Sequence, residues 1–382
     1  MPLIQLDVQA GRMLPADAYT SADVLAWELR HLFAGSWTCV GRVEDLFPTG
    51  DDGRAVRQRA LRVGDVGCLL VRGDDDIRMF ANTCRHRGHE LLADEDTSQR
   101  QSILCPYHAW TYDLGGALIG AKGFLRADDF DASAYGLVEL PVRVWAGFVF
   151  AHALHRMDDP AVPSFEEHLG DLAGIIAPYA PQNLVLADRH TYEIAANWKV
   201  IAENYHECYH CPLIHPELCQ VSPPDSGDNY DLPGAWVGGS MDLRDGMATM
   251  SLTGELAATP LPGAPADKVE YVHLLPNLLL SAHPDYVMAH RLTPLAPGRT
   301  FIECSWFVLP GSTNATGAVD FWDITNRQDW AACESVQRGL ASPHFEPGPF
   351  APNEDAVAQF VGLIGAAYRA GGLVSTADYA VR

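Results

Sequence analysis

The chain has 382 residues, of which 48% are hydrophobic and 20% charged, which is an ordinary globular composition at a length that suggests two domains. Its formal net charge of −23 repels nucleic acid and anionic membrane surfaces, so small molecules or a basic protein patch are the expected partners. No run of about 18 apolar residues is present to span a bilayer, and the first residues lack a signal-peptide layout, so we expect a cytoplasmic protein with no nucleic-acid or membrane partner.

The first predicted element is an amphipathic helix within residues 20–37. Val24, Leu25, Leu32 and Phe33 recur there at helical spacing, after Thr and Ser residues that are candidate caps. We assign residues 1–39 to an N-terminal helical segment that packs on the catalytic domain.

Short strand-like runs punctuated by Gly and Asp follow the helix. They read GCLLVRG, IRMFANT, SILCPYHAWTYDLGG and PVRVWAGFVFAH. These runs predict a small antiparallel β domain over residues 40–155. The polar stretch HRMDDPAVPS is the expected linker to a second domain over residues 156–382.

The second domain begins with a predicted strand at NLVLADRHTYEIA, which leads into a helix starting near Asn197. Further strands are predicted at VEYVHLLPNLLLSAH, DYVMAHRL and RTFIECSWFVLP, and helices over residues 317–339 and 353–370. The order favours an α+β class, with an antiparallel sheet flanked by helices. The run VSPPDSGDNYDLPGAWVGGSMDL is rich in Pro, Gly and Asp, and we expect a loop over the mouth of a pocket.

The β domain carries a group of potential metal ligands. Cys84-x-His86 is followed by 18 residues and then by Cys105-x2-His108. Two Cys and two His can enclose zinc, or they can hold a [2Fe-2S] cluster with the thiolates on one iron and the imidazoles on the other. The spacing favours the cluster, because each loop mixes one Cys with one His, whereas structural zinc sites usually pair cysteines within a loop.

The second domain carries another group, in the stretch ENYHECYHCPLIHPEL over residues 203–218. His210 and His215 lie five residues apart, one more than the spacing that stacks two side chains on a helix. We expect the helix to end or kink at Pro212, so that both imidazoles can reach one ion. Two histidines and one carboxylate on one face are the ligand set of a mononuclear iron that activates oxygen.

The carboxylate is expected from the helix over residues 317–339. Asp329 shares an apolar face there with Cys333 and Leu340, and an acid on such a face is costly unless it is paired or metal-bound. Asp320 and Asp323 are its rivals.

Three other residues of the motif are not expected to bind metal. His206 is read as a polar helix residue or a donor to an iron ligand. Cys208 and Cys211 are read as packing residues, because redox dithiols belong at the start of a helix that follows a strand, whereas these two cysteines lie late in the expected helix.

The two motifs together resemble a known family. CRHRG followed by CPYHAWTYDLGG, with the acid-x2-His-x4-His pattern at Glu207, His210 and His215, is similar to the terminal oxygenase (alpha) component of Rieske non-haem iron oxygenases. The resemblance implies a [2Fe-2S] cluster on Cys84, His86, Cys105 and His108, and an Fe(II) held by His210, His215 and Asp329. It also implies O2 as cosubstrate, with NAD(P)H supplying electrons indirectly through a separate reductase or ferredoxin.

The same resemblance implies a role for Glu207. In that family the acid before the first iron histidine bridges to a cluster histidine of a neighbouring subunit, usually in a homotrimer. Most ring-hydroxylating dioxygenases carry Asp there, whereas Glu within ENYHECYHCP resembles the choline, glycine betaine and carnitine monooxygenase branch.

The expected activity is therefore hydroxylation or oxidative demethylation of a small organic substrate, with a quaternary amine as the candidate. The candidates for an aromatic cage around its ammonium group are Tyr230, Trp236, Tyr271, Tyr286 and Trp306. The alternative function is aromatic-ring dioxygenation. Remoter alternatives are a zinc-stabilised binding module and a zinc hydrolase.

Overall fold

The structure of the chain is a computed structural model that describes residues 6, 8–124, 129–312 and 315–376. It divides into two compact units, which are described separately. The smaller is residues 28–163, and the larger combines Met1–Trp27 with Ser164–Arg382. Among the described residues, no helix is long and apolar enough to cross a membrane.

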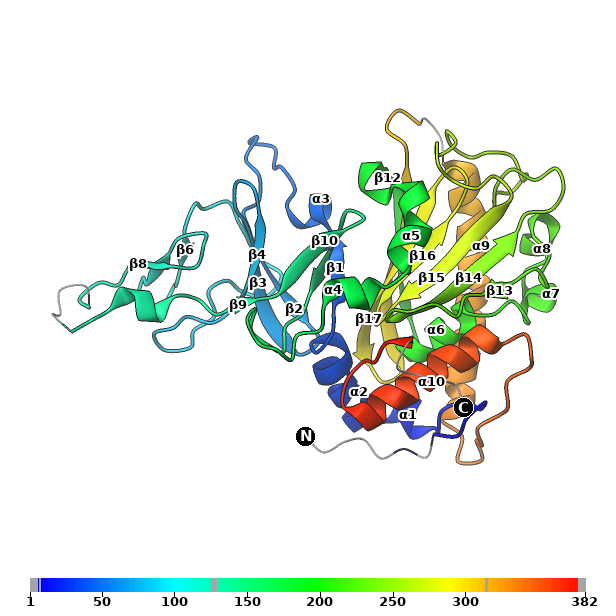
Figure 1. The fold of residues 1–382 in the computed structure, drawn as a ribbon, viewed down its shortest axis with the longest axis horizontal. Coiled ribbons are helices and arrows are strands. Elements are labelled where there is room, and N and C mark those ends of the chain that lie inside the picture. The colour runs from blue at the N-terminus through cyan, green and yellow to red at the C-terminus, as the bar shows by residue number, and fades with distance from the viewer. Residues whose placement is uncertain (1–5, 7, 125–128, 313–314, 377–382) are drawn as a thin grey trace. The chain divides into compact units, whose positions relative to one another are not determined.

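The smaller unit is built from short antiparallel strands (Figure 1). They form three sheets, ordered β1-β11-β10, β5-β2-β3-β4-β9 and β6-β7-β8. Their bounds are β1 Thr38–Arg42, β2 Gln58–Val63, β3 Val66–Arg72, β4 Ile77–Ala81, β5 Thr97–Ser98, β6 Ile103–Leu104, β7 Thr111–Tyr112, β8 Leu118–Gly120, β9 Glu139–Leu140, β10 Val142–Trp145 and β11 Phe148–Ala151.

The central strand β3 is apolar on both faces because each face meets a different core. Leu70 packs in a cluster with Val149 of β11, whereas Leu69 packs in another with Trp110 and Tyr112. Successive side chains of a strand point to opposite faces, so GCLLVRG reads as a continuous hydrophobic run rather than an alternating one. The second core lies beneath the loops that carry Cys84 and Cys105.

Helical elements of the N-terminal segment belong to both units, whose boundary falls between Trp27 and Glu28. The N-terminal helix expected within residues 20–37 is divided into α1 Asp17–Thr20, α2 Ala22–Glu28 and a π-helical turn η1 Leu29–Phe33. Shorter elements of the smaller unit are α3 Val43–Leu46 and η2 Ala132–Tyr135.

The larger unit is organised around one seven-stranded antiparallel sheet with the order β12-β18-β17-β16-β15-β14-β13. The bounds are β12 Val185–Ile194, β13 Asp228–Asn229, β14 Trp236–Asp242, β15 Lys268–Leu274, β16 Leu278–Ala282, β17 Val287–Ala296 and β18 Arg299–Val308. The expected α+β class, a small β domain beside a larger domain with an antiparallel sheet and helices, is confirmed.

The helices of the larger unit place the functional residues against this sheet. The long helices are α9 Thr316–Leu340 and α10 Asp355–Ala370, and α6 Trp198–Tyr205 contacts both of them. The shorter elements are α4 Phe165–Leu169, α5 Leu172–Ile176, η3 Ala177–Tyr179, η4 Pro181–Asn183, α7 Cys211–Ile214 and α8 Leu218–Val221.

Two expectations about this unit are wrong. The run over residues 269–283 is two strands, β15 and β16, joined at Leu275-Pro276-Asn277, because a proline cannot donate the hydrogen bond that a continuous central strand needs. The run over residues 221–243 is a loop only in its first half, since its second half is β14, whose backbone pairs with β15 from Trp236 to Asp242.

Candidate functional site

The two cysteines and two histidines of the smaller unit come together on neighbouring loops. Cys84 and Cys105 are each 2% exposed, His86 is half-buried and His108 is exposed. The rings of His86 and His108 lie 4.7 Å apart, and His86 stacks on Trp110 at 5.0 Å. The sulfurs therefore lie inside the unit and the imidazoles lie toward its surface.

Backbone hydrogen bonds fix both loops. The Cys84 amide donates to the His89 carbonyl at 2.8 Å, and the Cys105 amide donates to the Trp110 carbonyl at 2.8 Å. Gly88 has a φ of +70°, a left-handed conformation that glycine adopts without the steric cost of a side chain. His89 is exposed, in agreement with its place outside the ligand spacing.

This donor set fits a [2Fe-2S] cluster better than a single zinc ion. The two sulfurs lie together inside the unit and the two imidazoles lie together toward its surface. This division matches a cluster with the thiolates on one iron and the imidazoles on the other, whereas a single tetrahedral ion needs all four donors around one point. Burial is the main cause that raises the pKa of the Cys105 thiol, and the adjacent Cys84 sulfur adds to it, so a bound cation is needed to stabilise the thiolate form at this place.

The second group of ligands is positioned by a break between two helices. α6 ends at Tyr205, earlier than expected, and Pro212 does not end a helix but lies in the first turn of α7. Proline is well tolerated in a first turn because its missing N–H has no intrahelical partner there. His210 and His215 are the two caps of this single turn, which turns both imidazoles toward one point.

Three ligand atoms converge at that point. Nε2 of His210 lies 3.1 Å from Nε2 of His215. Oδ1 of Asp329, which α9 supplies, lies 2.8 Å from the His215 nitrogen and 3.2 Å from the His210 nitrogen. The side chains of His210, His215 and Asp329 are 17%, 1% and 16% exposed, so the point is largely shielded from water.

Each histidine is held by a partner on its other nitrogen. Nδ1 of His210 bonds a Glu207 carboxylate oxygen, and Nδ1 of His215 lies 2.7 Å from Oε1 of Gln328. A hydrogen bond at Nδ1 leaves Nε2 free as a ligand and fixes the ring orientation. Sequence analysis assigned no role to Gln328, although it immediately precedes Asp329.

The charges at this point suit a divalent cation. Burial by itself lowers the pKa of His210, but hydrogen bonds to Asp329 and Glu207 outweigh it and raise the pKa to about 9. Burial raises the pKa of Asp329, yet its bonds to the two histidines lower it below the ordinary value. The carboxyl groups of Glu207 and Asp329 beside two imidazoles therefore favour a bound cation, in agreement with the 2-His-1-carboxylate ligand set of non-haem Fe(II).

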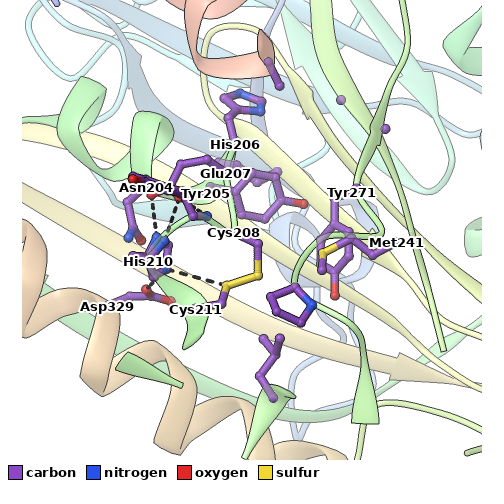
Figure 2. A pocket seen from close by; sticks show the side chains of 18 of the residues that line it. Asn204, Tyr205, His206, Glu207, Cys208, His210, Cys211, Met241, Tyr271 and Asp329 are labelled. Atoms are coloured by element: carbon purple, nitrogen blue, oxygen red, sulfur yellow. Dashed lines mark hydrogen bonds and ion pairs between the residues drawn. A yellow bond between two sulfur atoms is a disulfide. The ribbon is translucent and has the colours of Figure 1, made fainter. Parts of the chain in front are cut away.

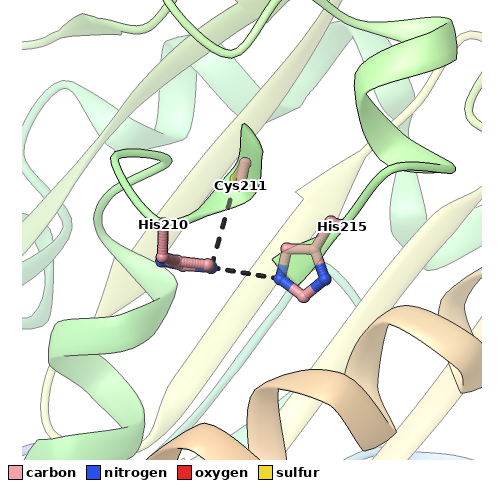
Figure 3. A group of neighbouring side chains, drawn as sticks. All are labelled: His210, Cys211 and His215. Carbon is pink, nitrogen blue, oxygen red and sulfur yellow. Dashed lines mark hydrogen bonds between the residues drawn. The ribbon is translucent and has the colours of Figure 1, made fainter. Parts of the chain in front are cut away.

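Cys211 lies beside the two histidines (Figure 3), close enough for a free thiolate there to share a metal ion with them. Its sulfur is joined to Cys208 in a disulfide, with the two Cα atoms 4.9 Å apart. The expectation that both cysteines are only packing residues is wrong, because they are bonded to each other. Its premise fails because these cysteines lie in the turn after α6 and at the start of α7, and not late in a helix.

His206 has a partner of its own away from His210, His215 and Asp329. Its Nε2 lies 3.3 Å from Nδ1 of His273, whose Nε2 donates to the Pro276 carbonyl at 3.0 Å. Figure 2 shows the His206 ring well apart from His210 and Asp329. His206 is therefore neither a ligand nor a donor to one.

The rival acids on α9 lie outside the converging group. Asp323 accepts from the Tyr192 hydroxyl at 2.7 Å and from Arg327 at 2.8 Å, and Asp320 is exposed. The partners of Asp323 explain its ionisation without a metal.

A cavity of about 210 Å³ opens beside the converging ligands. In Figure 2, Tyr271 and Met241 lie on the opposite side of it from His210 and Asp329. Of the five aromatic residues considered for a cage, Tyr271 lines this cavity. Trp236, Tyr286 and Trp306 are at most 1% exposed and belong to the core, and Tyr230 is bonded to Glu270 at 2.8 Å. Tyr205 and Trp322, which sequence analysis did not select, line the cavity beside Tyr271.

Comparison with known families covers both units. Residues 36–127 match the family described as the Rieske [2Fe-2S] domain. Residues 181–369 match the catalytic domain of the ring-hydroxylating alpha subunit.

Relatives match across most of the chain. The glycine betaine monooxygenase oxygenase subunit of Chromohalobacter salexigens is 30% identical over 90% of this chain and 82% of its own length. The carnitine monooxygenase oxygenase subunit of Acinetobacter baumannii is 38% identical over 53% of this chain and 52% of its own length.

Solved structures share the fold. A quaternary ammonium Rieske monooxygenase, described with carnitine oxidation by gut microbiota and inter-subunit electron transfer, is 26% identical with a TM-score of 0.74, covering 96% of this chain and 100% of its own. Naphthalene 1,2-dioxygenase from Rhodococcus sp. has a TM-score of 0.69 over 94% of each chain at 19% identity, which shows a common fold alone.

Proposed function

This chain belongs to the Rieske oxygenases whose catalytic domain is that of the ring-hydroxylating alpha subunits, and from that premise we propose that it oxidises a small quaternary amine. It is an oxidoreductase with a Rieske [2Fe-2S] domain and a mononuclear-iron catalytic domain. In the proposed reaction, one atom of O2 enters a C–H bond next to the nitrogen and the other leaves as water. Where the attacked carbon is an N-methyl group, the product collapses to a tertiary amine and formaldehyde.

The observation that carries the proposal is the convergence of His210, His215 and Asp329 at the wall of a cavity. When bound, the cluster supplies electrons and the mononuclear iron activates dioxygen. Three protein ligands on one face leave the cavity side of the site open for oxygen and substrate. The smaller unit contributes Cys84, His86, Cys105 and His108 as cluster ligands.

The chain's own side chains would prepare this site. Glu207 and Gln328 hold the imidazoles in the tautomer that presents Nε2, and the apolar wall formed by Leu279, Met288 and Leu292 keeps water from the reacting carbon. Such preorganisation lowers the cost of reaching the reactive geometry.

We assign Glu207 a second role as the bridge between the two kinds of centre, from its contact with His210 and from the surface position of the cluster histidines. An exposed His108 and a half-buried His86 are available to another copy of the chain. A homotrimer, with a separate reductase or ferredoxin as donor, would carry electrons from one copy's cluster to the next copy's iron. We also infer that the protein is cytoplasmic.

The quaternary amine is favoured over an arene because the relatives that match most of the chain's length carry glycine betaine monooxygenase names. The likeness to naphthalene dioxygenase extends to the fold only. Glu207, where dioxygenases of the family carry Asp, agrees with this choice. Aromatic-ring dioxygenation is therefore not proposed.

A single-turnover experiment tests the proposal without the unidentified reductase. Purified protein is reduced with dithionite, freed of reductant, and mixed with 18O2 and a panel of quaternary amines. We expect one labelled oxygen atom in the product, or formaldehyde with the matching tertiary amine. His210→Ala, with its cluster intact, is the control and should form neither. Failure of every quaternary amine, together with diol formation from an arene, would refute the proposal.

A further inference from the structure

The cavity is lined by acidic side chains without lysine or arginine among the described residues. Five carboxylates line it, Glu207, Asp225, Asp228, Asp329 and Asp355, and no lysine or arginine is among the residues that the structure places there. Of its histidines, His206 and His290 are neutral, because burial lowers the pKa of both, to about 4 for His290. Apart from the proposed iron and its ligands, a carboxylate entering this space would lose water and meet charged side chains of its own sign.

Two of the carboxylates are already committed to the iron ligands, but three are not. Asp225, Asp228 and Asp355 are exposed and have no cationic partner in the described chain. Asn229, next to Asp228, donates to Oε1 of Gln359 at 3.1 Å, which ties β13 to α10 and holds Asp228 and Asp355 at the same mouth. These three residues form an acidic rim.

The nearby cations are engaged elsewhere. Nζ of Lys268 lies 2.7 Å from Glu270, and Nε of Arg244 donates to the Cys219 carbonyl at 2.8 Å. Neither residue lines the cavity. The rim therefore has no internal counter-charge from these side chains.

Aromatic rings and unused polar atoms complete the lining. Tyr271 meets Tyr205 and Trp322 edge to face, at ring separations of 6.0 and 6.3 Å. The Tyr271 hydroxyl and Nδ1 of His290 are buried without a hydrogen-bond partner in the described chain. Because Nε2 of His290 lies 3.3 Å from Oδ1 of Asn326 and donates to it, Nδ1 is left as a free acceptor. Aromatic faces attract an ammonium group, and the unused atoms suit one neutral hydroxyl or amine group.

We propose that the substrate is a cation without a carboxylate, a quaternary amine whose only other polar group is neutral, and that the acidic rim rejects zwitterionic amines. This rests on the proposed function, because it specifies which members of that substrate class the same cavity accepts. It separates this chain from relatives that are named for glycine betaine or carnitine, both of which carry a carboxylate. In the bound state the rim and the rings surround the ammonium, and the neutral group reaches Tyr271 and His290.

Three probes of closely similar shape test the proposal by titration calorimetry on iron-loaded protein. Choline carries a cation and a hydroxyl, glycine betaine replaces the hydroxymethyl with a carboxylate, and 3,3-dimethylbutan-1-ol replaces the ammonium nitrogen with carbon. We expect choline to bind at least roughly tenfold more tightly than either of the others. Asp228→Asn should lower the affinity for choline roughly two- to fivefold, and Asp228→Lys should lower it further. Asp228→Lys should also raise the affinity for glycine betaine. All of these effects on affinity should become smaller as salt is added.

Asp188→Asn is the matched control, since Asp188 is an exposed acid on β12, at the opposite edge of the sheet from β13. It should leave all three affinities unchanged. Glycine betaine binding as tightly as choline, with turnover of both, would overturn this inference and leave the proposed function standing. If no quaternary amine binds or is oxidised, both fail.

Discussion

His215 and Gln328 are joined by a 2.7 Å hydrogen bond between Nδ1 and Oε1, one residue before the acid that faces the same histidine's other nitrogen. Gln328 in turn donates to Glu217 at 3.4 Å. One turn of α9 thus supplies both a candidate ligand and the group that orients another ligand, so the helix sets two sides of the iron site at once.

Gln328→Ala is predicted to weaken iron binding in the larger unit. The change frees the His215 ring to rotate and to exchange tautomers, and loss of such a supporting bond typically costs roughly tenfold or more in metal affinity. Metal content after dialysis against a weak chelator measures the effect, and the cluster absorbance should be unchanged. Ser335→Ala, an exposed change on the same helix, is the control. Equal iron retention in both variants would remove this role from Gln328.

Tyr112→Phe is predicted to lower the reduction potential of the cluster. The Tyr112 hydroxyl lies 3.3 Å from Sγ of Cys84 and accepts from the Arg85 amide at 3.1 Å, so its proton points to the sulfur. A hydrogen bond to a ligand thiolate stabilises the more negative, reduced cluster, and losing about 1 kcal/mol corresponds to roughly 50 mV for one electron.

Spectroelectrochemical titration of the cluster measures that shift. Tyr107→Phe is the matched control, because Tyr107 lies on the loop between Cys105 and His108 and its side chain is 51% exposed. A potential that stays unchanged in Tyr112→Phe, or rises, would contradict the assignment of Cys84 as a cluster ligand.

Glu203 predicts a pH dependence of stability. Burial is the main cause that raises its pKa, opposed by the Tyr19 hydroxyl at 2.7 Å and by Lys199, and the result is about 7 against the ordinary 4.5. Between these two values the folded protein keeps a proton that the unfolded chain has released. The contribution of Glu203 to the free energy of unfolding is therefore fully present below pH 4.5 and is lost as the pH rises through 7. It amounts to about 3 kcal/mol.

Glu203→Gln keeps the acceptor for Tyr19 and removes the titration. Between pH 5 and pH 8, the thermal midpoint of the wild-type protein should fall by more than that of the variant. Parallel curves for the two proteins would show that Glu203 is ionised throughout.

The parts of the fold that could be predicted are those that depend on the pattern of apolar and polar residues within one short segment. The strands at GCLLVRG, IRMFANT and RTFIECSWFVLP and the helix α9 follow from runs of apolar residues and helical periodicity, and the structure confirms them. β14 was expected to be part of a loop because it contains Gly238 and Gly239, whose α-carbons pass close to the neighbouring backbone.

In the candidate site, too, some features could be predicted from local sequence and others could not. The ligand types and spacings of the two motifs, and an acid on an apolar helix face, are visible in the sequence. The bonds of His215 with Gln328 and of His206 with His273 are not, because the residues of each pair lie 113 and 67 positions apart and meet only after folding. The acidic rim was visible only in part, since Asp225 and Asp228 lie in the run expected over the pocket mouth, whereas Asp355 comes from α10, more than 100 residues further along the chain.

The central claim is that one chain holds a Rieske cluster on Cys84, His86, Cys105 and His108 and a separate iron on His210, His215 and Asp329. Iron and acid-labile sulfide assays of anaerobically reconstituted protein, with electron paramagnetic resonance of the reduced cluster, test it most directly. We predict about three irons and two sulfides per chain, with His210→Ala losing one iron and retaining the sulfide and the cluster signal. Protein that binds a single metal ion and no sulfide would contradict the account.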